Sequence, residues 1–175
     1  MYHTQEHRGS HVLLKAPVMC TREDAWLGEA YYFWLSREDA ERWGDKSKRT
    51  TGRYDIYTSQ IACDNVLDTV FNEEHYNFWL ETIEDAAKKI FKTIRRKPTL
   101  KELNDYLKER AAWDEEVTGI LFQDLPANSY YSWVQPINYR DKRLIYFSYR
   151  KRIQLALYNL TAMSTFAHLV TKECV

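Results

Sequence analysis

Three short stretches of this chain of 175 residues carry side chains that could do chemistry. The first is Tyr2-His3-Thr4, and the third is Gln154-Leu155-Ala156-Leu157-Tyr158-Asn159. The second stretch lies between them and reads Gly28-Glu29-Ala30-Tyr31-Tyr32-Phe33-Trp34. A further aromatic residue, Trp43, follows it. Aromatic rings hold a flat or cationic ligand by stacking, and the amide oxygen of a Gln accepts a hydrogen bond.

Signatures of several other chemistries are missing from the sequence. It has no Gly-rich phosphate loop, no Gly-x-Gly-x-x-Gly, no Gly-x-Ser-x-Gly and no His-Glu-x-x-His. The five histidines lack ligand spacing, so we expect no metal site. Cys20, Cys63 and Cys174 are scattered and odd in number, which indicates free thiols in a reducing compartment.

Together the three stretches resemble the motifs of the diphtheria-toxin and poly-ADP-ribose-polymerase branch of the ADP-ribosyltransferases. That family has a strand-borne His in a His-Gly-Ser or similar tripeptide, then a Tyr in a Gly-x-Tyr-Phe run with a second aromatic eleven residues on, and a late acid that opens a strand. His3, Tyr32 with Trp43, and Gln154 match these positions in order. The resemblance implies one α+β domain over residues 1–175, with a split β core around an NAD cleft and a helical hairpin inserted at about 73–113.

The resemblance also implies roles for the matching residues. His3 would hold the adenosine-side ribose of NAD, and Thr4 would also belong to the cofactor-binding set. Tyr32 and Trp43 would clamp the cationic nicotinamide ring, at roughly 0.5 to 2 kcal/mol per contact. The catalytic set would be His3, Tyr32 and Gln154, all lining one cleft with Trp43 at its edge.

Gln154 stands where the family most often has Glu. Its amide oxygen can accept the hydrogen bond of the nicotinamide-side ribose, but it brings no charge to the oxocarbenium-like transition state. We therefore expect slower catalysis or help from a carboxylate elsewhere, for which Asp124 and Glu173 are the candidates. The missing acid also favours mono-ADP-ribosylation over polymer synthesis.

The resemblance thus predicts a mono-ADP-ribosyltransferase that modifies a macromolecule, with a protein as the first candidate. Small bacterial toxins and phage-encoded modifiers of host proteins act in this way. Two alternatives stay open: an NAD glycohydrolase of the same fold, and a catalytically silent module that binds ADP-ribose or a protein. Lys plus Arg and Asp plus Glu both number 25, which gives no overall bias toward nucleic acid or membrane. The polar N-terminus and the lack of a long apolar run favour the cytoplasm.

The same residues admit purely structural explanations. His3 could be a frayed terminal residue. Tyr32 and Trp43 could be core rings in a chain with 15% aromatic residues, and Gln154 could be a surface residue of a strand. The basic run Arg95-Arg96-Lys97 is typical of a solvated helix end and only secondarily of a nucleic-acid patch.

The elements that must position these residues follow from periodicity. Apolar residues recur at three and four positions in the middle of the chain, which predicts a helix whose stripe is core: Tyr76, Trp79, Leu80, Ile83, Ala87, Ile90, Phe91 and Ile94. Arg95-Arg96-Lys97-Pro98 ends this helix, and Thr99 with Glu102 forms a capping box for a second helix, which we expect to run to about Trp113. This hairpin would cover the cleft or choose the target.

Strand patterns return in the last third of the chain. They predict strands at 117–122, 143–147 and 153–158. The short polar break Arg150-Lys151-Arg152 predicts that the last two form a β-hairpin.

Overall fold

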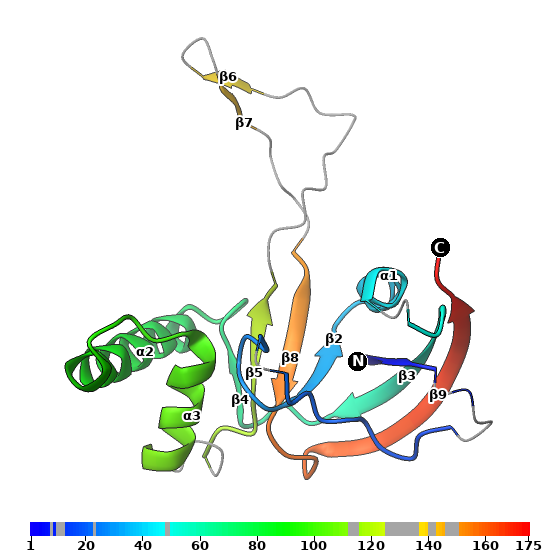
Figure 1. The fold of residues 1–175 in the computed structure, drawn as a ribbon, viewed down its shortest axis with the longest axis horizontal. Helices are drawn as coiled ribbons and strands as arrows, with labels where there is room; N and C mark the ends of the chain where they lie inside the picture. The colour runs from blue at the N-terminus through cyan, green and yellow to red at the C-terminus, as the bar shows by residue number, and fades with distance from the viewer. Residues whose placement is uncertain are drawn as a thin grey trace.

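The computed structural model describes residues 1–7, 9, 13–22, 24–47, 50–111, 116–124, 137–139, 143–145 and 151–175. The elements are, in chain order, β1 (Tyr2–Glu6), β2 (Tyr31–Trp34), α1 (Arg37–Ser47), β3 (Arg53–Ile61), β4 (Val66–Asp68), α2 (Glu73–Ile94), α3 (Leu100–Ala111), β5 (Gly119–Gln123), β6 (Ile137–Tyr139), β7 (Arg143–Ile145), β8 (Ile153–Leu157) and β9 (Met163–Glu173). One sheet of seven strands has the order β4-β5-β8-β2-β1-β3-β9, and β6 pairs with β7 (Figure 1). The fold is α+β, as the sequence predicted.

The large sheet brings strands from both ends of the chain together. β1 pairs with β3 along its whole length but with β2 only at Tyr2↔Trp34. On its other side β2 pairs with β8, with Trp34 opposite Gln154, and β8 pairs in turn with β5. The strands that carry the N-terminal, middle and C-terminal motifs are therefore neighbours in the sheet.

Side chains on both faces of the sheet are buried, which explains the nearly unbroken apolar run of β8. Leu155 and Leu157 pack with Phe33 in one cluster. Ala156 points the other way and packs with Trp79 of α2. Figure 1 shows α2 and α3 beside the β4 end of the sheet, while α1 lies at the other half.

Most of the expected helical hairpin is confirmed. α2 begins after Asn72, whose side chain accepts a hydrogen bond from the backbone N–H of His75, and ends at Arg95 in the left-handed conformation. The Thr99–Glu102 capping box is formed in both directions, with N···O distances of 2.8 and 3.2 Å. Trp113, the expected end of the second helix, lies outside the described residues.

The prediction that the whole stripe of α2 is core was wrong. Trp79 is buried, and Ile83, Ala87 and Ile90 pack partly against the core. The remaining members of the stripe are exposed: Tyr76, Leu80, Phe91 and Ile94. Periodicity marks an apolar stripe, but the width of the buried part depends on how much of the helix rests on the sheet.

The predicted hairpin between the last two strand patterns was also wrong. β8 lies between β2 and β5, whereas β7 pairs with β6. A strand that is apolar on both faces gains more from two partners inside a covered sheet than from one partner across a short turn. The strand expected at 117–122 is β5, and residues 146–147 lie outside the described part of the chain.

None of the helices in the described part of the chain combines the length and the apolar composition that a membrane span requires.

Candidate functional site

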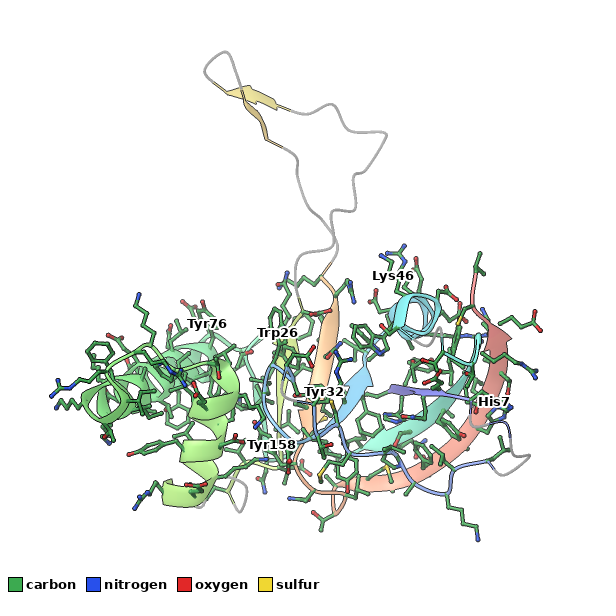
Figure 2. All side chains as sticks on the ribbon, viewed as in Figure 1. His7, Trp26, Tyr32, Lys46, Tyr76 and Tyr158 are labelled. Atoms are coloured by element: carbon green, nitrogen blue, oxygen red, sulfur yellow. The ribbon has the colours of Figure 1, made fainter. Side chains whose placement is uncertain are left out.

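A cleft of about 910 Å³ lies beside β1, β2, β5 and β8. It has a size suited to a cofactor or drug-sized ligand. The described residues of the segment 18–26, which are 18–22 and 24–26, form the rest of its wall together with α1. Figure 2 labels Trp26, Tyr32 and Lys46, which line the cleft from that segment, from β2 and from α1. All five residues predicted to bind or react line this cleft: His3, Thr4, Tyr32, Trp43 and Gln154.

The predicted hairpin does not cover this cleft. None of the described residues of α2 or α3 lines it. The wall that the hairpin was expected to provide comes instead from the segment 18–26, which sequence reasoning left without a role. Its signal was weak, because a connecting segment has no periodicity.

The register of the sheet determines which side chains share the cleft. Tyr32 lies opposite Ala156, and Trp34 lies opposite Gln154, which also faces Phe122 of β5. Directly opposed residues of an antiparallel pair project from the same face. Tyr32, Trp34, Phe122 and Gln154 therefore form one continuous surface.

His3 is an ordered, buried residue, so the frayed-terminus explanation is wrong. Only 4% of its surface is exposed. Its Nδ1 lies 2.9 Å from the carbonyl oxygen of Tyr32, and the backbone N–H of Val18 points to its Nε2 at 3.5 Å. With Nδ1–H donating and Nε2 accepting, the neutral imidazole joins β1 to β2 and to the segment 18–26.

Thr4 has a structural contact in addition to its place at the cleft. Its Oγ1 donates a hydrogen bond of 2.9 Å to the carbonyl oxygen of Ala40 in α1. The bond is buried and fixes α1 against β1, so this hydroxyl can offer a ligand only its lone pairs.

Tyr32 uses its hydroxyl within the protein. The hydroxyl donates to the carbonyl oxygen of Gly28 at 2.9 Å and accepts from the backbone N–H of Leu27 at 3.1 Å. Burial raises the pKa of Tyr32, so the hydroxyl stays protonated at neutral pH. Gly28 has a φ of 73°, which only glycine adopts readily, and Tyr32 holds this turn closed.

The two rings of the expected clamp belong to different packing clusters. Tyr32 meets Phe122 edge-on, with ring centroids 6.4 Å apart, in the cluster beneath α2 and α3. Trp43 packs against Trp34 at 5.9 Å, in the cluster beneath α1. The core explanation therefore holds in part for both rings, although both also line the cleft.

A carboxylate and a guanidinium lie in the cleft with Gln154, and neither was predicted as a primary site residue. Arg152 Nη2 and Asp124 Oδ2 are 2.9 Å apart, in side chains that are 19% and 16% exposed. Arg152 directly precedes β8, two positions before Gln154, and its guanidinium lies 5.0 Å from the centre of the Trp34 ring. Within the described part of the chain, the buried Nε of Arg152 has no hydrogen-bond partner.

Of the two carboxylates considered as substitutes for the family acid, only Asp124 lines the cleft. It directly follows β5, and its backbone N–H donates to the carbonyl oxygen of Arg152 at 2.8 Å. Glu173 is the last residue of β9, opposite Arg53, and is not among the lining residues.

Basic side chains outnumber acidic ones in the described lining of the cleft. This lining holds the basic residues Arg22, Arg42, Lys46 and Arg152 and the acidic residues Asp24 and Asp124. Three of the basic residues also have carboxylate partners: Arg22 pairs with Asp24, Arg42 with Glu38 and Arg152 with Asp124. Arginine and lysine side chains that converge on one cleft favour a ligand with phosphate groups.

Comparison of the chain with protein-family models, with curated proteins and with solved structures gave no match.

Proposed function

We propose that this cleft binds NAD and that the chain is a mono-ADP-ribosyltransferase. One observation carries the proposal. Three motif-like stretches that are separated by most of the sequence meet in one cleft, on strands that neighbour one another. His3, Tyr32 and Gln154 are each the second residue of their strand.

The residues of the cleft fit the parts of NAD. The basic side chains suit its pyrophosphate. The aromatic surface of Tyr32, Trp34 and Trp43 suits a flat cationic ring. Gln154 suits a ribose hydroxyl, since its amide oxygen is an acceptor.

Bound NAD supplies a nicotinamide–ribose bond that breaks with nicotinamide taking the electron pair, after which the acceptor bonds to the ribose carbon and loses a proton. The chain's part is to stabilise the developing positive charge. Of the two carboxylates in the described lining, Asp124 is much less exposed than Asp24, at 16% against 68%, so we assign this part to Asp124. Arg152 positions it through their ion pair. Gln154 adds an uncharged hydrogen-bond acceptor. The neutral amide of Gln154, at the position where the resembling family has an acid, favours single transfer over polymer synthesis.

Transfer to a macromolecule, in first place a protein, is the reaction we propose. Purified protein incubated with labelled NAD and cell lysate should label a macromolecule. Release of free ADP-ribose alone would instead identify an NAD glycohydrolase.

A silent binding module is the second candidate, because one observation favours it. The carboxylate of Asp124 is paired with Arg152, and the hydroxyl of Tyr32 is hydrogen-bonded to the backbone. These two polar groups of the cleft are therefore already engaged within the protein and not available to the reaction. Such a module would bind ADP-ribose without releasing nicotinamide from NAD. Calorimetric titration with ADP-ribose, alongside the lysate assay, separates the two.

A further inference from the structure

Four large apolar side chains on α2 lie exposed along one side of the helix. Tyr76, Leu80, Phe91 and Ile94 are 45%, 40%, 46% and 39% exposed. At about 100° of rotation per residue these positions fall within roughly 60° of one another. They lie next to the buried line of Trp79 and Ala86, so α2 carries a second apolar stripe that the sheet leaves uncovered.

The exposed stripe has a symmetric order along the helix. Tyr76 and Leu80 occupy its first half, Phe91 and Ile94 its second half, and the small residue Ala87 lies between them. Reversing the direction of the helix about residues 85–86 therefore gives nearly the same pattern, with two large apolar side chains in each half.

The charges of α2 and the residues just after it are divided between its two halves. The first half carries only acidic charges: Glu73, Glu74, Glu81, Glu84 and Asp85. The second half and the residues that follow carry only basic ones: Lys88, Lys89, Lys92, Arg95, Arg96 and Lys97. Compensation of the helix dipole explains such charges only in the first and last turns, and Glu81, Glu84 and Lys88 lie in the middle.

We propose that the exposed stripe of α2 binds a second copy of this chain, with the two α2 helices antiparallel about a two-fold axis at the level of residues 85–86. In this arrangement Tyr76 of one copy packs near Ile94 of the other, and Leu80 packs near Phe91. The acidic half of each helix then faces the basic half of the other. A two-fold interface requires a surface that is complementary to itself, and an apolar stripe with charges divided in this way has that property.

The charged groups beside the stripe are able to change partners. Lys88 Nζ lies 3.0 Å from Glu84 Oε1 in the same helix, and both side chains are more than half exposed. An exposed pair of this kind is held weakly. Each member can therefore pair with the opposite residue of the second copy at little cost.

Self-association through α2 leaves the cleft accessible, because no described residue of α2 lines it. The dimer and the proposed NAD chemistry can therefore be tested separately.

The test is the molar mass of the full chain by light scattering and analytical ultracentrifugation over about a hundredfold range of protein concentration. The wild-type protein should shift from monomer to dimer as its concentration rises, and Leu80→Glu with Phe91→Glu should remain monomeric. Phe78→Glu is the matched control. Phe78 is 51% exposed on the same helix but lies about 200° around it from Tyr76, so this variant should still dimerise.

A charge exchange tests the orientation without touching the apolar residues. Glu81→Lys with Glu84→Lys should weaken the dimer at least tenfold, and adding Lys88→Glu with Arg95→Glu should restore it. Circular dichroism establishes that each variant keeps its helices. Three results would each overturn the proposal. The wild-type protein could be monomeric at all concentrations, Phe78→Glu could dissociate the dimer, or the variant with all four charges reversed could fail to restore it.

Discussion

At the scale of single residues, the proposed turnover depends most on Asp124, the less exposed of the two carboxylates in the described lining of the cleft. Asp124→Asn keeps the size of the side chain and removes its charge. If this charge stabilises the developing cation, nicotinamide release from NAD should fall on the order of a hundredfold. Glu173→Gln is the matched control, since Glu173 does not line the cleft, and it should release nicotinamide at the wild-type rate.

Gln154 is tested in the same assay. Gln154→Ala removes a hydrogen bond that strengthens as positive charge develops, and should lower nicotinamide release by roughly a hundredfold. Gln154→Glu keeps an acceptor and adds the charge that the resembling family uses, so release should rise. Unchanged release in both variants of an active protein would remove Gln154 from the site.

Tyr32 requires a more conservative change than truncation to alanine, because its hydroxyl closes the turn at Gly28. Tyr32→Phe retains the ring and removes both hydrogen bonds of the hydroxyl. We expect the free energy of unfolding to fall by about 1–3 kcal/mol, since each hydrogen bond contributes about 0.5–1.5 kcal/mol. NAD affinity, measured by calorimetry, should stay within about threefold of wild type if the ring face makes the contact. A large loss of affinity with unchanged stability would assign the hydroxyl to the ligand.

At the scale of elements, the start of α3 is held by a charged clamp. Glu102 accepts hydrogen bonds from Arg96 and from the backbone N–H of Thr99, and these lower its pKa to about 2. A carboxylate with a lowered pKa in the folded protein stabilises the fold above its unfolded value of about 4.5. That contribution is lost as the pH falls from about 4.5 toward 2.

Arg96→Ala removes the larger cause of this lowered pKa, so the pKa of Glu102 should rise. In urea unfolding, the wild-type protein should be more stable than the variant above about pH 5, and the difference should shrink as the pH falls below 4.5. Lys92→Ala, an exposed change near the end of α2, should show a difference that does not depend on pH in this range. A difference in the free energy of unfolding between wild type and Arg96→Ala that stays constant down to pH 3 would contradict a stabilising role for the Arg96–Glu102 pair.

The elements that the sequence predicted well are those with local causes. The boundaries of α2 and the capping box of α3 depend on residues within one turn of each other, and both are as expected. The partners of β8 and the exposure of Leu80 depend on distant parts of the chain. Periodicity contains no information on those contacts, and the predictions failed there.

At the scale of the whole molecule, the site likewise contains residues that the sequence identified and residues that it missed. His3, Tyr32 and Gln154 were expected to meet, and the sheet brings them together because β1, β2 and β8 are neighbours. Arg152 was missed, although it lies two positions before Gln154, directly ahead of β8. Its signal required knowing which face of β8 is turned to the cleft and that Asp124 directly follows the neighbouring strand β5.

The walls of the cleft come from β1 near one end of the chain and from β8 near the other, so a ligand bound there should oppose global unfolding. A ligand present at a hundred times its dissociation constant adds about 2.7 kcal/mol to the free energy of unfolding. In a chain of this length that corresponds to a rise in melting temperature on the order of 5–10 °C.

NAD should produce this rise in scanning fluorimetry, whereas nicotinamide alone should produce much less, because it lacks the phosphates that the basic wall would hold. Arg42→Glu with Lys46→Glu reverses two charges of that wall on α1 and should reduce the shift, while Phe78→Glu on α2 should leave it unchanged. Equal shifts in the wild type and the α1 variant would place NAD outside this cleft, and no shift at millimolar NAD would argue against NAD as its ligand.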